Sequence, residues 1–131
     1  MGMRIAHIAI LVRDYDEAIA WYTQALDFEL VEDRPMPGKR FVRVAPRGGG
    51  TSLVLARAAN EEQASRIGAQ TGGRVFLFLH TDDFAGTYAR LERHGTRFTE
   101  APRHEEYGTV VVFEDLYGNK WDLIEPREAV R

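Results

Sequence analysis

The chain has 131 residues, of which 44% are hydrophobic and 28% charged, and its formal net charge is -3. This length is enough for one compact unit that buries roughly two-thirds of the surface exposed by the unfolded chain. Lys and Arg residues are scattered along the chain, so the charge pattern argues against a nucleic-acid-binding surface. The absence of cysteine excludes disulfides, thiolate metal sites and a cysteine nucleophile.

The apolar run near the N-terminus, residues 5–12, is too short to span a membrane, and charged residues follow it at once. It also lacks the layout of a secretion signal. We therefore expect a cytoplasmic protein that has neither a nucleic acid nor a membrane as a partner.

Residues 4–12 have the pattern of a strand that is apolar on both faces, which is typical of an interior strand. His7 is the one polar side chain on its face. Asp14 then offers an N-cap for a helix whose apolar stripe includes Ala18 and Tyr22. Three β-like segments follow, at residues 28–31, 40–45 and 51–56. This order predicts a βαβββ module over approximately residues 1–57.

The same order returns after a connector at approximately residues 58–73, which includes a short polar helix near residues 60–66. Another doubly apolar strand is followed by a helix that begins after Asp83 and stops at Gly95. Aligning Asp14 with Asp83 also places His7 on Phe76. Further β-like segments lie at residues 97–99, 108–113 and 120–125. The pattern predicts a second βαβββ module, at approximately residues 74–131, within a single domain of residues 1–131.

The last two of these segments predict a hairpin around residues 115–119, where Gly118 and Asn119 suit a tight connection. Along its second strand the side chains alternate, so Lys120, Asp122 and Ile124 share one face. Asp122 therefore lies between strand neighbours, where a carboxylate needs a partner or a function. Residues 104–107 have the composition of a loop.

These segments resemble the vicinal oxygen chelate superfamily, which includes glyoxalase I, extradiol dioxygenases, and fosfomycin- and bleomycin-resistance proteins. The residues that carry the resemblance are 7–12 with Asp14, 18–22, and the hairpin at 113–123. The resemblance implies an α+β fold in which two βαβββ modules form a curled mixed sheet around a cavity, often in a homodimer. The modules pair either within one chain or across such a dimer.

In metal-dependent members of this superfamily, the ligands come from the first and last strands of each module. Carried over by position, they are His7 and Asp122, which suit a divalent metal such as Zn, Ni, Mn or Fe. The other two positions fall near Leu53 and Phe76, whose side chains cannot ligate a metal. His7 is alternatively a pocket-lining histidine satisfied by one hydrogen bond, and Asp122 an exposed carboxylate paired with Lys120. Facing one cavity, the two would be candidates for catalytic proton transfer.

Several other residues are candidates to line the cavity. By alternation His80 shares a face with Phe76 and Phe78, while Asp82 or Asp83 beside it is expected to cap the next helix. Arg43 either points to solvent or reaches an anionic substrate. The expected pocket-lining residues are Leu53, Phe76, Phe78, His80, Arg43 and Tyr107.

Two functions follow as hypotheses. The first is a protein that binds a small apolar or aromatic molecule in the cavity between the βαβββ modules, with its chemistry unassigned. The alternative is a divalent-metal-dependent lyase, isomerase or dioxygenase that uses His7 and Asp122. No nucleotide-binding fingerprint occurs in the sequence, so no nucleotide cofactor is expected.

Overall fold

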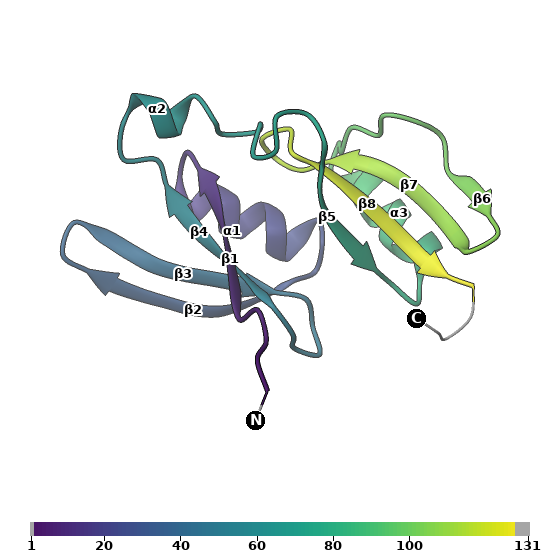
Figure 1. The fold of residues 1–131 in the computed structure, drawn as a ribbon, viewed down its shortest axis with the longest axis horizontal. Helices are drawn as coiled ribbons and strands as arrows, with labels where there is room; N and C mark the ends of the chain where they lie inside the picture. The colour runs from purple at the N-terminus through teal and green to yellow at the C-terminus, as the bar shows by residue number, and fades with distance from the viewer. Residues whose placement is uncertain (1, 128–131) are drawn as a thin grey trace. The chain divides into compact units, whose positions relative to one another are not determined.

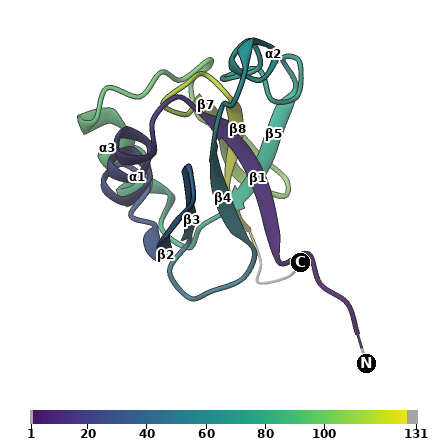
Figure 2. The same cartoon turned by 90° about the vertical axis from the view of Figure 1, so that its left-hand side faces the viewer.

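The computed structural model describes residues 2–127, and the chain divides into two compact units, Met1–Ile67 (unit 1) and Gly68–Arg131 (unit 2). Each unit holds a four-stranded mixed sheet, and one helix covers one face of that sheet (Figures 1 and 2). Neither sheet is closed. Within the described residues, no helix is long and apolar enough to cross a membrane.

Unit 1 contains β1 (His7–Val12), α1 (Tyr15–Gln24), β2 (Glu29–Met36), β3 (Lys39–Ala45), β4 (Ser52–Arg57) and α2 (Glu61–Ala64). Its strand order is β1-β4-β3-β2, with β1 parallel to β4 and the other neighbours antiparallel. The sequence pattern suggested an interior strand at β1, but β1 is an edge of this sheet. Its second apolar face, with Ala9 and Leu11, lies opposite the core residues Ile10 and Val12.

Unit 2 repeats this arrangement with β5 (Val75–His80), α3 (Phe84–Arg93), β6 (Arg103–Glu105), β7 (Gly108–Glu114) and β8 (Lys120–Pro126). Its strand order is β5-β8-β7-β6, with β5 parallel to β8. The two units therefore share one topology, which confirms the expected βαβββ repeat.

Both long helices begin at the predicted aspartates. The Asp14 carboxylate accepts a hydrogen bond from the Glu17 amide at 2.8 Å, and the Asp83 carboxylate accepts one from the Gly86 amide at 3.0 Å. These bonds satisfy amides that have no partner within the first helical turn. Of the two aspartates expected to cap α3, Asp83 is therefore the one that does so.

At residues 97–99 the structure has one antiparallel bridge to β7 in place of the expected strand. Only Phe98 forms an isolated bridge there, to Phe113, and its ring stacks on Tyr88 of α3 at 4.4 Å. Close by, the Glu100 carboxylate accepts the hydrogen bond of the Val112 amide. The paired strand is instead β6, so the loop expected at residues 104–107 was also partly wrong. Backbone hydrogen bonds of Arg97 and Thr99 with Glu114 and Val112 flank the bridge, and the Glu100 side chain takes the place of the next backbone acceptor, which alternation alone does not reveal.

The β7–β8 turn is organised by one buried carboxylate. Asp115 is only 6% exposed, and its carboxylate accepts hydrogen bonds from five donors at 3.0 to 3.2 Å. Three donors are the amides of Tyr117, Gly118 and Asn119. The others are the Asn119 side-chain amide and the Trp121 indole. The carboxylate therefore ties the turn to the core ring of Trp121 and holds β8 in register.

Replacing Asp115 with Ala should lower the free energy of unfolding by about 3 kcal/mol or more, because several buried donors would lose their acceptor. Asp14→Ala, which removes the capping bond to the Glu17 amide, should cost about 1 kcal/mol. Urea unfolding of both variants measures the difference. Equal losses would show that the turn does not depend on this carboxylate.

Candidate functional site

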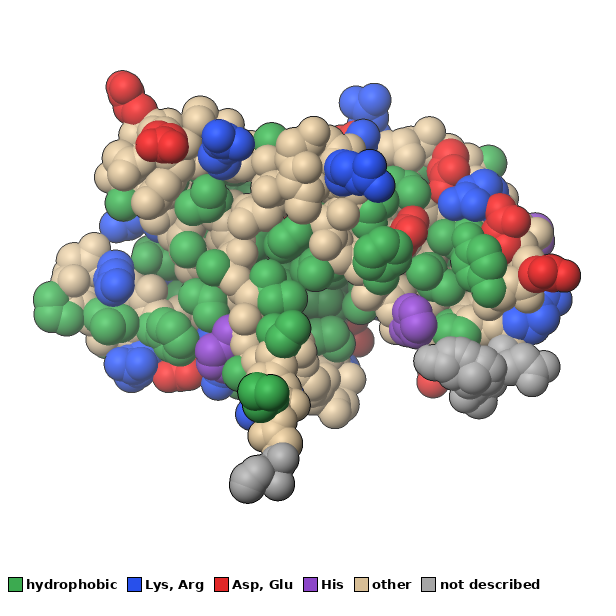
Figure 3. Space-filling model, viewed as in Figure 1, with side chains coloured by type: hydrophobic (Ala, Val, Ile, Leu, Met, Phe, Trp, Pro, Cys, Tyr) green, Lys and Arg blue, Asp and Glu red, His purple; other side chains and the backbone are tan. Residues whose placement is uncertain are grey.

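Each sheet has one face that its own helix does not cover, which we call the open face. In unit 1 the strand register brings together His7 with Ser52, and Arg43 with Val54, on this face. In unit 2 it brings together Phe78, Asp122 and Val112. In the view of Figure 3, hydrophobic side chains of unit 2 gather over the strands, with acidic and basic side chains around them.

The open face of unit 1 carries a chain of hydrogen bonds. The Arg43 guanidinium donates to Glu32 at 3.0 Å and to the Ser52 hydroxyl at 3.2 Å. The Ser52 hydroxyl lies 2.8 Å from Nδ1 of His7. His7 also meets the ring of Phe41 edge to face, with centroids 6.3 Å apart. Arg43 is therefore engaged within the sheet face, and the hydrogen-bond partner of the His7 ring among the described residues is Ser52.

This chain has a preferred direction. Arg43 can only donate, so the Ser52 oxygen is an acceptor towards it. Ser52 is only 2% exposed, and its own hydroxyl hydrogen needs an acceptor. Nδ1 of His7 supplies one if it carries no proton. The neutral imidazole is then protonated on Nε2, which makes the outward nitrogen a hydrogen-bond donor.

Leu53 does not lie on the face where the sequence analysis expected it. It is 4% exposed and belongs to the core, where it pairs in register with Ile8 and Val44. Ser52, its neighbour, occupies the open face opposite His7. A one-residue difference in register exchanges the two faces of a strand. Ser52 was missed because the sequence alone did not give the alignment of β4 with β1.

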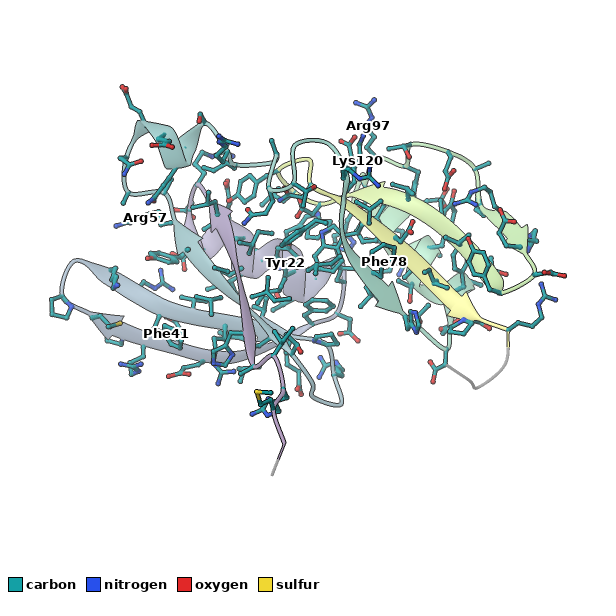
Figure 4. The ribbon with its side chains drawn as sticks, viewed as in Figure 1. Tyr22, Phe41, Arg57, Phe78, Arg97 and Lys120 are labelled. Atoms are coloured by element: carbon teal, nitrogen blue, oxygen red, sulfur yellow. The ribbon has the colours of Figure 1, made fainter. Side chains whose placement is uncertain are left out.

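On the open face of unit 2, Asp122 lies between Val112 of β7 and Phe78 of β5. Its Oδ1 atom is buried, and no hydrogen-bond partner for it occurs among residues 2–127. Phe78 beside it is 65% exposed, and Figure 4 marks its place on β5. An unsatisfied carboxylate oxygen thus adjoins an uncovered aromatic ring.

Burial raises the pKa of the Asp122 carboxyl above its ordinary value of 3.8, since a charged group is poorly solvated there. The positive charge of Arg103 opposes this rise in pKa, and the negative charge of Glu100 adds to it. Arg103 offsets the effect of burial on the Asp122 pKa only in part, because its guanidinium is bonded to two other carboxylates. It donates to Glu100 at 3.0 Å and to Glu105 at 2.6 Å.

The remaining expected pocket residues do not all lie on the open face of unit 2. His80 lies on the same face as Phe78, two residues along β5, in register with Ile124. The pairing of β5 with β8 is irregular between Val75 and Leu77, so the alternation breaks at Phe76. The Phe76 ring instead meets the core ring of Trp121 edge to face at 6.4 Å. Tyr107 precedes β7 and is exposed, beside the Arg103 cluster.

The donor groups do not fit the metal site that the family resemblance implies. Within the described residues, no three His, Asp or Glu side chains form a group that could hold a metal ion. The neighbours of Asp122 in register are Phe78 and Val112, whose side chains cannot ligate a metal. We therefore derive no chemical step through a metal.

For the neutral imidazole of His7, the tautomer with the proton on Nε2 should outnumber the tautomer with the proton on Nδ1 by roughly ten to one. The reason is that a hydrogen bond from Ser52 worth about 1.4 kcal/mol stabilises the first tautomer. Long-range proton–nitrogen NMR identifies the tautomer. His94 is an internal control, because its Nδ1 lies 2.9 Å from the Arg90 carbonyl and must donate. Ser52→Ala should shift the tautomer of His7 and leave that of His94 unchanged. A wild-type His7 protonated on Nδ1 would contradict the assignment.

Asp122→Asn should be more stable than the wild type at pH 7. Because the pKa of Asp122 is raised, the ionised carboxylate lowers the free energy of unfolding. This loss of stability is complete above the folded-state pKa and absent below 3.8, where the carboxyl is protonated in both states. The advantage of the variant should therefore shrink as the pH falls. Asp33→Asn is the control of opposite sign, since Arg40 lowers the pKa of Asp33. Urea unfolding across pH measures both, and a destabilised Asp122→Asn at pH 7 would refute the argument.

Comparison with known proteins agrees with this geometry. The family model for the Glyoxalase/Bleomycin resistance protein/Dioxygenase superfamily matches residues 4–123. An uncharacterized protein of Shewanella frigidimarina is 53% identical over 128 residues, covering 95% of each chain.

Two solved structures share the fold along nearly their whole length. A superfamily member from Sphaerobacter thermophilus is 29% identical, with a TM-score of 0.80, and the match covers 95% of this chain and 98% of that chain. TnmS3, an antibiotic binding protein from Streptomyces sp. CB03234, is 28% identical, with a TM-score of 0.78, and the match covers 96% and 97%. With its repeated βαβββ units and the match over residues 4–123, the chain belongs to the Glyoxalase/Bleomycin resistance protein/Dioxygenase superfamily.

Proposed function

We propose that this protein binds a small apolar or aromatic molecule on the open face of unit 2, with Asp122 as the polar anchor. The observation that carries the proposal is the buried, unpartnered Oδ1 of Asp122 beside the exposed ring of Phe78. We further propose that it does so in the cytoplasm as a homodimer, the state that the family resemblance implies. No reaction is assigned to it.

The apolar part of the proposal rests on exposed aromatic surface. Phe78 and Tyr107 are large exposed side chains, and Val112 and Ile124 lie half-buried on the same face as Phe78. Covering about 100 Å² of such surface stabilises a complex by roughly 2.5 kcal/mol before the cost of association. Apolar walls with a few well-placed polar groups are typical of small-molecule sites.

Asp122 indicates the chemistry of the ligand. An unpaired buried oxygen is a cost in the free protein, and a ligand that donates a hydrogen bond to it removes that cost. The donor would be a hydroxyl or an N–H group on a flat apolar body. A phenol meets both requirements. A carboxylate ligand does not, because it would face the negative charge of Asp122.

The comparisons support binding as the function. TnmS3 is named as an antibiotic binding protein, and its likeness to this chain extends over 96% of the residues. The alternative is a metal-dependent lyase, isomerase or dioxygenase using His7 and Asp122, and the residues that the structure describes hold no donor group of three to support it.

Calorimetric titration with 2-naphthol and 2-methoxynaphthalene, in the presence of EDTA, tests the proposal. The methoxy compound has the same rings and no hydroxyl donor. The wild type should bind 2-naphthol about ten-fold more tightly, because a hydrogen bond to a carboxylate is worth roughly 1.5 kcal/mol more than none. Asp122→Asn should reduce that preference and leave the methoxy compound unaffected.

Phe78→Ala should weaken the binding of both compounds. Val31→Ala, which removes an exposed apolar side chain from unit 1, should leave both affinities unchanged. Equal affinity of the wild type for the two naphthalenes would remove Asp122 as the anchor. Binding that is unchanged in Phe78→Ala would remove the open face of unit 2 as the site.

A further inference from the structure

Strands β3 and β4 of unit 1 pair over only part of their length. Val42–Val44 are in register with Leu53–Leu55, and there the pairing stops. Beyond it, β3 continues to Lys39 against β2, and β4 continues to Arg57 against β1. The two strands diverge, as Figure 1 shows, and a groove of about 620 Å³ opens between them.

The root of this groove is filled by Tyr15, at the start of α1. Its hydroxyl accepts a hydrogen bond from the Arg40 amide at 3.3 Å, in place of a partner on β4. The guanidinium groups of Arg40 and Arg57 each lie over the Tyr15 ring, 5.1 Å from its centroid. Cation–π contacts of this kind hold both arginine side chains in position. Side-chain contacts of Tyr15 therefore fill the space where the two strands separate.

The walls of the groove are mostly apolar. Phe41 lies on β3, and Val54 and Ala56 lie on β4, with Ala58 and Ala59 beyond the strand end. Figure 4 marks Phe41 and Arg57 on the two diverging strands. The volume falls within the roughly 300 to 1,000 Å³ of small-molecule sites. A flat apolar body has both the space and the surface to bind here.

The polar lining is basic. Lys39, Arg40 and Arg57 line the groove, and no acidic residue of the described chain does. Arg40 is committed to carboxylates outside the groove, at 3.0 Å to Asp16 and 2.8 Å to Asp33. Lys39 and Arg57 are exposed, and neither forms an ion pair with a carboxylate within residues 2–127. Two uncompensated cations thus lie at the rim of an apolar groove.

We infer that this groove is a second binding site, for a small organic anion that carries a flat aromatic body. Arg57 donates to the carboxylate of the ligand in the planar, two-point manner of guanidinium groups, and the ring lies against Phe41. All its lining residues fall between Tyr15 and Ala59, within unit 1. The site therefore does not depend on Asp122, and its ligand has the opposite charge preference.

Titration of isotope-labelled protein with indole-3-acetate, followed by amide NMR, tests this site. Signals of Gly38, Phe41, Ala58 and Ala59 should shift, and those of β8 should not. Uncharged indole-3-acetamide should bind about ten-fold more weakly, because it lacks the charge-assisted hydrogen bond. Inorganic phosphate should bind more weakly still, since it has no apolar body. Shifts confined to unit 2, or equal binding of any two probes, would overturn the inference.

Arg57→Gln should weaken indole-3-acetate about ten-fold. Arg97→Gln, which removes an exposed arginine of unit 2, is the matched control and should have no effect. Since Arg57 also contacts the buried Tyr15, Lys39→Gln provides a second variant at the rim, with a loss of several-fold expected. Amide spectra of the free variants check that each is folded. Unchanged binding in both groove variants would contradict the site. Asp122→Asn should bind indole-3-acetate normally, which separates this test from that of unit 2.

Discussion

One helix per sheet is the constraint on which this structure depends. A βαβββ unit has a single long helix, and that helix covers one face of four strands. The buried face is filled by ordinary core residues such as Ile10, Leu55, Phe113 and Leu123. The other face has no cover from that helix, and it carries polar and aromatic groups such as His7, Phe78 and Asp122. Both candidate metal ligands of the sequence, His7 and Asp122, lie on such faces.

Two carboxylates of the same hairpin differ in how their oxygens are satisfied. Asp115 accepts hydrogen bonds from five donors and holds the turn together. Asp122, on the strand that follows, has a buried oxygen without a partner and a raised pKa. A buried polar group normally finds a partner inside the protein. Where it does not, we infer that a ligand supplies the missing hydrogen-bond donor.

The sequence predicted the repeat, the helix caps and the alternation of β8, because each depends on residues that are close in the chain. Ser52, Glu100 and the irregularity at Phe76 could not be predicted in this way. They depend on the register between strands that are distant in sequence, where a shift of one residue exchanges the faces. The groove between β3 and β4 was missed for the same reason, since no local pattern marks where two strands stop pairing.

The crystal structure of the complex with 2-naphthol tests the central claim most directly. The account predicts the naphthol oxygen about 2.7 Å from Oδ1 of Asp122, the distance of a hydroxyl-to-carboxylate hydrogen bond, with the rings against Phe78. Asp122 would then have the partner that it lacks in the free protein. A ligand bound away from this face, or a metal ion coordinated by Asp122 in its place, would contradict the account.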